Sequence, residues 1–335
     1  MKKKIFITGI AGFLGSYLAQ EFLGLGYEVV GNDNLIGGYR DNVPKGAKFY
    51  KVDCCNTKKM TKIMKDCDTV YHCAALAYEG LSVFSPAIVT KNIVYASMSV
   101  ISAAIANNVK RFIYMSSMAR YGKRKVPFKE DYLPKPQDPY GIGKFSVELM
   151  LMNLAETHGM EYVIAVPHNI IGPRQKYDDP YRNVASIMVN LMLQGRQPII
   201  YGDGKQKRCF SFIQDVVDCL VYMKDSYKVN KEVINVGPDE GFVTIKRLAI
   251  TIAELLNFKL EPIYVKGRPR EVKLATCCSD KARRLLGYHT TFNLEDGLEE
   301  IIYYIKQRGP KKFKYHLPVE ILNSKTPKTW SNKMF

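Results

Sequence analysis

The sequence predicts an α/β fold, in which a doubly wound parallel sheet is followed by a smaller C-terminal α/β domain. Three observations support this fold class. Residues 1–115 alternate short apolar runs with helical patterns, as strands joined by crossover helices do. Gly9, Gly12 and Gly15 separate the first apolar run from the first helical pattern. Asp33 follows the second apolar run, 18 residues after Gly15.

The first apolar run, residues 5–7, suits a strand that is buried in a parallel sheet. The glycines after it carry no side chains, so the backbone can approach a pyrophosphate closely, and the next helix would offer free N–H groups to the phosphates. A glycine-rich turn without function is the alternative. We predict a Rossmann-type dinucleotide site whose first contacts are Gly9, Gly12, Phe13, Leu14 and Gly15.

Asp33 stands just after the second predicted strand, residues 27–31. A carboxylate there can accept hydrogen bonds from both ribose hydroxyls of the adenosine, and it would repel a 2′-phosphate. The sequence therefore predicts NAD rather than NADP as the cofactor, with Asn34 next to Asp33 in the same site.

Three further strands are predicted in the first half, over residues 48–52, 69–73 and 111–115. We expect Thr57 to cap a helix over 57–65, and a long helix over 84–107. Ligands bind at the carboxyl ends of the strands in such sheets. The residues at these ends that we predict to contact the cofactor are Asp53, Cys54, Ala74 and Ala75.

The composition limits the classes of function. The chain has 49 Lys and Arg against 32 Asp and Glu, which gives a formal net charge of +17. Nucleic-acid binding is one interpretation of this charge, but the basic residues are spread along the chain without interleaved aromatic residues. We favour an anionic small substrate, such as a nucleotide diphosphate, and predict no nucleic-acid partner.

The cysteines and the apolar segments bear on location. The eight cysteines include the adjacent pairs 54–55 and 277–278 but no CxxC motif, so no metal site is predicted. Reduced thiols in a cytoplasmic protein are the expectation. No run of 18 apolar residues is present, so no transmembrane helix is predicted. The glycine turn explains the start of the chain better than a secretory signal does.

Tyr140 and Lys144 form the candidate catalytic pair. Pro139 suits the first turn of a helix, and residues four apart on a helix share a face. A lysine ammonium near a phenol would lower the phenol pKa from about 10, so that Tyr140 could act as a general base. This spacing alone is common on protein surfaces. It gains meaning from Ser117, whose hydroxyl at a strand end can bond the same substrate oxygen.

The second half of the chain is organised differently. Loops rich in Gly, Pro and Arg lie at 169–174, 201–208 and 266–270, with helical patterns between them at 182–194 and 245–256.

These patterns suggest the domain boundaries. Residues 1–173, with returns near 209–238, would form the NAD-binding domain, and residues 174–208 and 239–305 the substrate domain. Residues 306–335 would form a basic C-terminal extension, with eight Lys or Arg against one Glu.

Together these motifs resemble the extended short-chain dehydrogenases/reductases, and among them the NAD-dependent sugar epimerase/dehydratase family. The resemblance runs from residue 4 to about residue 305. It rests on the glycine turn, on Asp33 and Asp53, on the segment 72–75, and on Ser117 with Tyr140 and Lys144. It continues in the motifs Asn169-Ile170-Ile171-Gly172-Pro173, Gly202-Asp203-Gly204 with Arg208, and Arg268-Pro269.

The resemblance implies roles at the nicotinamide end of the site. Ser117, Tyr140 and Lys144 would be the catalytic residues, and Tyr140 and Lys144 would also touch the cofactor. Asn92 and Pro167 would belong to the NAD site, with His168 beside Pro167 near the nicotinamide.

The resemblance also implies a substrate site for a nucleotide-diphosphate sugar. Asn169 would bond the diphosphate, and Arg208 and Arg268 would neutralise it as bidentate donors. Ala275, seven residues after Arg268, would close one side of the sugar pocket and, being small, would admit an N-acetyl group.

Two positions after Ser117 distinguish the reactions of the family. Its 4,6-dehydratases place Asp-Glu there, its decarboxylases a Glu at the second place, and its 3,5-epimerases a Cys at that place. Met118 and Ala119 cannot transfer a proton. What remains is oxidation and re-reduction at one carbon, most commonly C4 epimerisation of a UDP-hexose. A nucleotide-sugar 2-epimerase, a 4-keto reductase and a non-enzymatic NAD-binding scaffold stay as alternatives.

Two features depart from the family. Arg270 stands where a Gly usually separates Pro269 from the acid at Glu271, and the basic extension has no family counterpart. The helices over 84–107 and 140–158 are apolar on more than one face, whereas a surface helix needs one apolar stripe. We therefore predict a homodimer joined through these helices.

Overall fold

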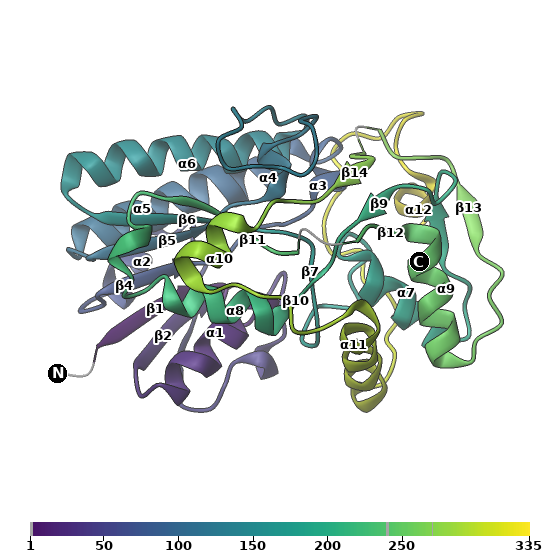
Figure 1. Ribbon diagram of the computed structural model, residues 1–335, viewed down its shortest axis with the longest axis horizontal. Coiled ribbons are helices and arrows are strands. Elements are labelled where there is room, and N and C mark those ends of the chain that lie inside the picture. The colour runs from purple at the N-terminus through teal and green to yellow at the C-terminus, as the bar shows by residue number, and fades with distance from the viewer. Residues whose placement is uncertain (1–2, 239–240, 270) are drawn as a thin grey trace.

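A computed structural model describes residues 3–238, 241–269 and 271–335 of the chain (Figure 1). Its main element is a seven-stranded sheet with all neighbouring strands parallel, in the order β11-β6-β5-β4-β1-β2-β3. The strands are β1 (Lys4–Thr8), β2 (Glu28–Asp33), β3 (Lys48–Lys51), β4 (Thr69–His72), β5 (Arg111–Met115), β6 (Glu161–Pro167) and β11 (Val233–Val236). The predicted doubly wound fold of the Rossmann type is confirmed.

Helices cover both faces of this sheet (Figure 1). One face packs against α1 (Phe13–Gly24), α8 (Ile213–Tyr222) and α10 (Asp280–Leu286), and their buried side chains share a core with Ile5 and Ile7 of β1. The other face packs against α2 (Thr57–Ile63), α4 (Pro86–Thr90), α5 (Ala96–Ala106) and α6 (Pro139–His158). Because β1, β5 and β6 are buried over most of their length, their sequences are almost continuously apolar.

Two helix ends differ from the prediction. The cap of α2 is Asn56, whose side chain accepts the N–H of Lys59 at 3.1 Å, and Thr57 is the first helical residue. The long helix predicted over 84–107 starts at Pro86 and contains one π-helical segment, Lys91–Tyr95, between α4 and α5. Both differences depend on which nearby groups form hydrogen bonds, and the periodicity of apolar residues does not predict this.

The continuous helical segment Pro86–Ala106 is the one candidate membrane span among the described residues, by length and apolar composition. Half of its most apolar window is buried inside the molecule, where α5 packs against α2 and α6. Core packing therefore explains part of the apolar character of this segment.

The second half adds a smaller layer of helices to the carboxyl edge of the sheet (Figure 1). The helices α7 (Val184–Leu193), α9 (Ile245–Leu256) and α11 (Leu294–Arg308) share a core of their own. Short strands accompany them, namely β7 (Ile170–Ile171), β8 (Ile199–Tyr201), β9 (Lys207–Arg208), β10 (Ser211–Phe212), β12 (Val243–Thr244), β13 (Ile263–Val265) and β14 (Leu274–Ala275).

Not every segment of the second half belongs to this layer. β11 and α8 return to the main sheet. α10 also packs against β11 and α8, although its residues fall in the range 239–305 that we assigned to the substrate domain. Two short helices remain, α3 (Glu79–Ser82) and α12 (Lys328–Ser331).

Candidate active site

A cavity of about 470 Å³ opens where the carboxyl ends of the central strands face the second half of the chain. Every predicted site residue except Ala275 lines it. These residues are Gly9, Gly12, Phe13, Leu14, Gly15, Asp33, Asn34, Asp53, Cys54, Ala74, Ala75, Asn92, Ser117, Tyr140, Lys144, Pro167, Asn169, Arg208 and Arg268.

The glycine turn between β1 and α1 leaves no room for side chains. Gly9 has a φ of +69°, and a Cβ on it would lie 3.0 Å from the backbone of Ala74. A Cβ on Gly15 would lie 2.3 Å from the carbonyl oxygen of Gly9. Gly12 precedes α1 without a side-chain cap, so the first N–H groups of the helix stay available to an anion. This turn fits the pyrophosphate of a dinucleotide.

Asp33 is held in place at the end of β2. Its Oδ1 accepts the N–H of Leu35 at 2.7 Å, and its Oδ2 accepts the N–H of Ala11 at 3.1 Å. These two bonds orient the carboxylate and leave lone pairs for ribose hydroxyls. Asn34 donates a hydrogen bond to Asp53 at 2.8 Å, which ties the ends of two neighbouring strands together. The arrangement fits the adenosine half of NAD.

Two other residues that we predict to contact the cofactor, Asn92 and Cys54, form hydrogen bonds within the chain. Asn92 lies in the π-helical segment, a feature that often marks functional sites, and donates to the carbonyl of Ile88 at 2.9 Å. Cys54 is buried and accepts a hydrogen bond from Asn32 at 3.3 Å. Burial raises the pKa of the Cys54 thiol to about 12, so this side chain offers a neutral wall to the cavity.

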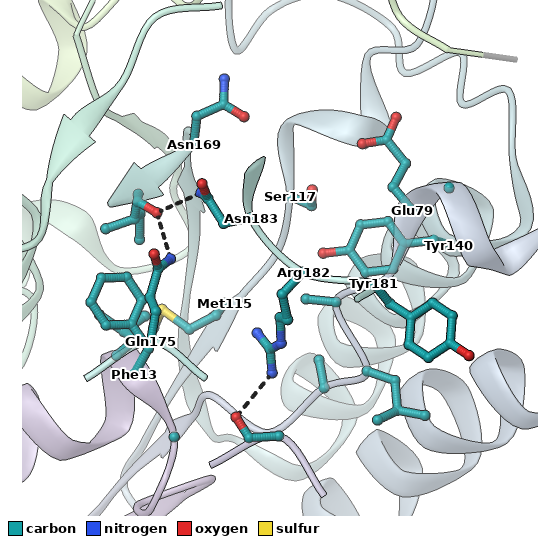
Figure 2. Close-up of a pocket in the computed structure, with 18 of the residues that line it drawn as sticks. Phe13, Glu79, Met115, Ser117, Tyr140, Asn169, Gln175, Tyr181, Arg182 and Asn183 are labelled. Atoms are coloured by element: carbon teal, nitrogen blue, oxygen red, sulfur yellow. Dashed lines mark hydrogen bonds between the residues drawn. The ribbon is translucent and has the colours of Figure 1, made fainter. Parts of the chain in front are cut away.

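The catalytic candidates come from two neighbouring elements. α6 begins at Pro139, and Asp138 caps it by accepting the N–H of Gly141 at 2.8 Å. This cap places Tyr140 in the first turn, with its hydroxyl pointing towards Ser117 (Figure 2). Ser117 follows β5, and its hydroxyl accepts the N–H of Ala119 at 3.2 Å. The two hydroxyl groups therefore face one region of the cavity.

Lys144 lies behind Tyr140 on the same helix. Its Nζ donates to the carbonyl of Met115 at 2.7 Å and lies 6.0 Å from the ring centroid of Tyr140. Burial lowers the pKa of Lys144 to about 8. Burial also raises the pKa of Tyr140 to about 12, although a hydrogen bond with Ser117 opposes this rise. We expected Lys144 to lower the phenol pKa of Tyr140. In the protein without cofactor this pKa is raised instead, because desolvation is the larger effect.

Two arginines line the opposite end of the cavity. Arg268 donates to Glu271 at 2.9 Å, and its guanidinium lies 4.6 Å from the ring centroid of Tyr201. Arg208 donates to the carbonyl of Val272 at 2.6 Å, and burial lowers its pKa. Asn169 sits nearby on the loop after β6 and donates to the carbonyl of Cys209 at 3.0 Å. Two guanidinium groups and an amide offer the donors that a diphosphate needs.

A family model described as the NAD dependent epimerase/dehydratase family matches residues 5–237, more than half of the chain. The chain belongs to this family. It is accordingly an NAD-dependent enzyme, and the glycine turn with Asp33 is where its dinucleotide site fits.

Three similar proteins give the family context. A UDP-glucose 4-epimerase of Thermotoga maritima, solved with UDP-glucose, is 31% identical with a TM-score of 0.85, covering 91% of this chain and 99% of its own. A UDP-glucuronic acid 4-epimerase of Bacillus cereus, solved with UDP-glucuronic acid and NAD, is 30% identical with a TM-score of 0.85, covering 91% and 100%. A UDP-N-acetyl-alpha-D-glucosaminuronate decarboxylase of Bacillus cytotoxicus is 29% identical over 329 residues, covering 92% and 99%.

Sequence reasoning missed a buried pair of charged side chains that supports the loop after Ser117. The Arg120 guanidinium lies 2.9 Å from the Glu148 carboxylate, both side chains are almost fully buried, and Ser116 donates to the same carboxylate. Arg120 follows Ser117 in the loop, whereas Glu148 comes from α6. The pair therefore fixes the Ser117 loop against the helix that carries Tyr140 and Lys144. No spacing rule links positions 120 and 148.

Two further charged side chains in the cavity were also missed. Arg182 lies in the middle of the cavity, where it donates to the carbonyl of Gly37 at 3.3 Å (Figure 2). Glu79 at the start of α3 lines the same cavity near Tyr140 (Figure 2). Burial, with Asp138 nearby, raises the pKa of Glu79 to about 7, whereas Arg208 and Arg268 oppose this rise. Neither residue belongs to a motif that the sequence alone makes visible.

Ala275 does not line this cavity. It is fully buried in β14, beside Arg208 in register, and its side chain packs in the core with Cys277 and Phe128. Counting seven residues from Arg268 fails because the alternation of a strand turns this position away from the cavity. Val272 lines the cavity instead. Arg270, the departure from the family pattern, lies outside the described residues.

Two remaining expectations concern histidine and metal. His168 is buried and does not line the cavity, although Pro167 and Asn169 on either side do. Burial lowers the pKa of His168 to about 3, which keeps the ring neutral. In the part of the chain that the structure describes, no cluster of three or more His, Cys, Asp or Glu could hold a metal ion.

Proposed function

We propose that this enzyme epimerises a UDP-hexose at C4 through a transient 4-keto sugar. The observation that carries the proposal is the pairing of Ser117 and Tyr140 in a cavity whose catalytic loop has no acid. Met118 and Ala119 follow Ser117 directly, and Ala119 is buried. Dehydration and decarboxylation in this family use an acid in that loop, so oxidation and reduction at one carbon is the reaction that these residues support.

The protein's own part in this reaction is proton transfer and positioning. Tyr140 takes the proton of the sugar 4-hydroxyl as the C4 hydride leaves, while Ser117 binds the same oxygen. Lys144 holds a positive charge behind the phenol. Bound NAD supplies the hydride acceptor and later the donor, and its oxidised ring adds a positive charge that favours the phenolate.

Inversion requires the keto sugar to present its other face. Asn169, Arg208 and Arg268 would hold the diphosphate while the sugar turns about its bond to the phosphate. Tyr140 returns the proton when the hydride arrives on the opposite face. Arg182 lies between the two ends of the cavity, where its donors could bind sugar hydroxyls in either orientation.

The names of similar proteins support this choice in part. The two solved neighbours are 4-epimerases, one with UDP-glucose and one with UDP-glucuronic acid. The decarboxylase relative marks the competing reaction. Decarboxylation would need an acidic group in the cavity. The Glu79 carboxyl is such a group, although it comes from α3 rather than from the Ser117 loop.

The proposal is tested by incubating the NAD-loaded protein with UDP-glucose, UDP-N-acetylglucosamine and UDP-glucuronic acid, and resolving the products by NMR. A C4 epimer of at least one sugar, with no net change in bound NAD, is the expected result. A pentose product with release of CO₂ would make the enzyme a decarboxylase, and a C2 epimer would move the reaction to another carbon.

We also infer a homodimer in the cytoplasm. Tyr95, Ile142 and Leu149 are each more than half exposed on the helical layer formed by α4, α5 and α6. Exposed large apolar side chains on neighbouring helical segments suit a subunit interface. None of the eight cysteines, all within the described residues, forms a disulfide, which suits a reducing compartment.

A further inference from the structure

The basic extension is an ordered part of the substrate end of the molecule. Residues 309–335, here called the C-terminal strap, run from α11 to α12 along the second half (Figure 1). Tyr177 donates to the carbonyl of Gly309 at 2.9 Å, and Asn190 binds both backbone groups of Lys311, at 2.8 and 2.9 Å. The two solved epimerases leave about a tenth of this chain unmatched while matching almost all of their own.

The strap also reaches the half that carries the sheet. The Glu320 carboxylate accepts the N–H groups of Ala87 and Ile88, both at 2.9 Å, and so caps α4. Ser85 donates to the carbonyl of Pro318 at 2.8 Å. The strap therefore fastens both halves of the molecule at the substrate end of the cavity.

Apolar side chains of the strap fill the space between these two attachments. Leu317 and Trp330 are buried in one cluster with residues of both halves. Their partners in this cluster are Leu76, Tyr78, Leu81, Phe84 and Tyr181. Phe335 packs against the same cluster and lines the cavity itself. The strap thus supplies part of the cavity wall.

Two strap residues support Arg268. The hydroxyl of Thr329 hydrogen-bonds to the hydroxyl of Tyr201, whose ring lies under the Arg268 guanidinium. Trp330 and Arg268 both approach Gly80, since a Cβ there would lie 3.5 Å from the indole and 3.1 Å from the guanidinium. Arg268 is therefore enclosed by Tyr201, Glu271, Gly80 and the strap, and Thr329 bonds the tyrosine on which its guanidinium lies.

A third strap residue supports Arg182. The ring of His316 lies 3.7 Å from the carboxylate of Asp179. Asp179 is buried, accepts the hydroxyl of Tyr78 at 2.6 Å and lies 3.9 Å from the Arg182 guanidinium. The strap therefore contacts the supports of two arginines that line the cavity.

We propose that the C-terminal strap positions Arg268 for binding the nucleoside diphosphate, with Thr329 and Trp330 as positioning residues. The strap sets the affinity for the diphosphate part of the substrate and leaves the affinity for NAD unchanged. The inference takes only the class of ligand from the proposed function, namely nucleoside diphosphates and nucleoside-diphosphate sugars.

The test uses the full chain loaded with NAD and measures UDP binding by calorimetry. Thr329→Val removes the hydroxyl but keeps the shape, and it should weaken UDP binding about 2- to 10-fold, the worth of one hydrogen bond. Thr329→Ser keeps the hydroxyl and should bind UDP like the wild type. KM for the sugar nucleotide should rise with kcat little changed, because the loss concerns binding common to substrate and transition state.

A matched control lies within the strap. The hydroxyl of Thr326 donates to the carbonyl of Ile321 at 3.1 Å, remote from Arg268, so Thr326→Val should leave UDP binding unchanged. The Kd for NAD should match the wild type in all three variants. If Thr329→Val does not fold, Tyr201→Phe removes the same bond from the other side and should weaken UDP binding to a similar extent.

The outcomes separate this inference from the proposed function. Unchanged UDP affinity in a folded Thr329→Val or Tyr201→Phe protein would overturn the positioning role, whatever the reaction is. A wild type that binds UDP but epimerises no sugar would remove the proposed function and leave the strap inference standing. A wild type that does not bind UDP at all would overturn both.

Discussion

The surroundings of Tyr140 oppose, on balance, the ionisation that its proposed role as general base requires. Burial, Glu79 and Asp138 raise the pKa of its phenol, whereas Ser117 and Arg182 lower it. The net result in the chain by itself is a pKa of about 12, so the phenol is protonated at neutral pH. If Tyr140 ionises only when oxidised NAD is bound, the phenol will not lose its proton to solvent in the enzyme without cofactor.

Replacing Tyr140 with Phe should leave folding and NAD binding intact and reduce kcat at least ~10²-fold, the scale of a lost general base. Steady-state turnover with measured NAD content is the readout. The control is Tyr121→Phe, another buried tyrosine, which bonds Asn235 at 2.8 Å outside the cavity lining and should keep its turnover. Near-normal turnover by the Tyr140 variant would remove the phenol from the mechanism.

His72 should give the stability of the protein a measurable pH dependence. Its ring is buried between the hydroxyls of Thr8 and Ser97, at 2.7 and 2.8 Å, and burial, with Lys144 nearby, lowers its pKa to about 3. An unfolded histidine has a pKa of about 6.5. Between these values only the unfolded state binds the proton, so the contribution of His72 to stability is lost as the pH falls below about 6.5.

The expected slope is up to about 1.4 kcal/mol per pH unit. Urea unfolding of the wild type and His72→Gln at pH 7, 6 and 5 isolates this slope as the difference between the two proteins, because the other titrating groups are common to both. The wild type should lose more stability than the variant on acidification. Parallel pH dependences would show that His72 does not carry the effect.

At the scale of elements, the turn from β1 to α1 depends on backbone space. Gly15→Ala places a Cβ 2.3 Å from the carbonyl oxygen of Gly9, so the turn must shift. We expect the Kd for NAD to rise about tenfold or more, equivalent to about 1.4 kcal/mol. Gly24→Ala is the matched control, because nothing lies within 4 Å of a Cβ at the other end of the same helix.

Calorimetric titration with NAD compares the two glycine variants. Gly24→Ala should bind like the wild type and gain some helix stability. A Gly15→Ala protein with wild-type affinity would mean that the turn does not cradle the cofactor.

At the scale of the whole molecule, the layer formed by α4, α5 and α6 should be a subunit interface. Light scattering at micromolar concentration is expected to give a dimer. Leu149→Arg places a charge on an apolar side chain of α6 that is 52% exposed and should yield a monomer. Leu133→Arg, at a 72% exposed position outside these helices, should remain a dimer. A wild-type monomer would contradict the interface.

The sequence predicted best the features that depend on residues close together in the chain. The strand at residues 5–7, the glycine spacing and the Tyr140/Lys144 pair all depend on neighbours within a few residues. The structure forms the strand and brings the glycines and the Tyr140/Lys144 pair to one cavity. The positions that it did not predict depend on distant partners. Ala275 faces the core because β14 pairs with β9. The cap of α2 is an exception, because Asn56 rather than Thr57 accepts the N–H of Lys59, only three residues away.

The same reason explains the other omissions. Arg120 and Glu148 meet only because the Ser117 loop packs on α6. The strap binds Tyr201 and α4 through contacts more than a hundred residues apart in the chain. Desolvation of Tyr140 likewise needs the assembled fold, so the direction of its pKa shift was beyond a pairwise argument with Lys144.

The fate of the C4 hydrogen tests the central claim most directly. UDP-glucose labelled with deuterium at C4 is incubated with the NAD-loaded protein in ordinary water, and the products are examined by NMR and mass spectrometry. If the hydride leaves and returns at one carbon, the C4 epimer should form with deuterium retained at C4. An epimer that has exchanged its C4 deuterium for solvent hydrogen, or the absence of any epimer, would contradict oxidation and re-reduction in this cavity.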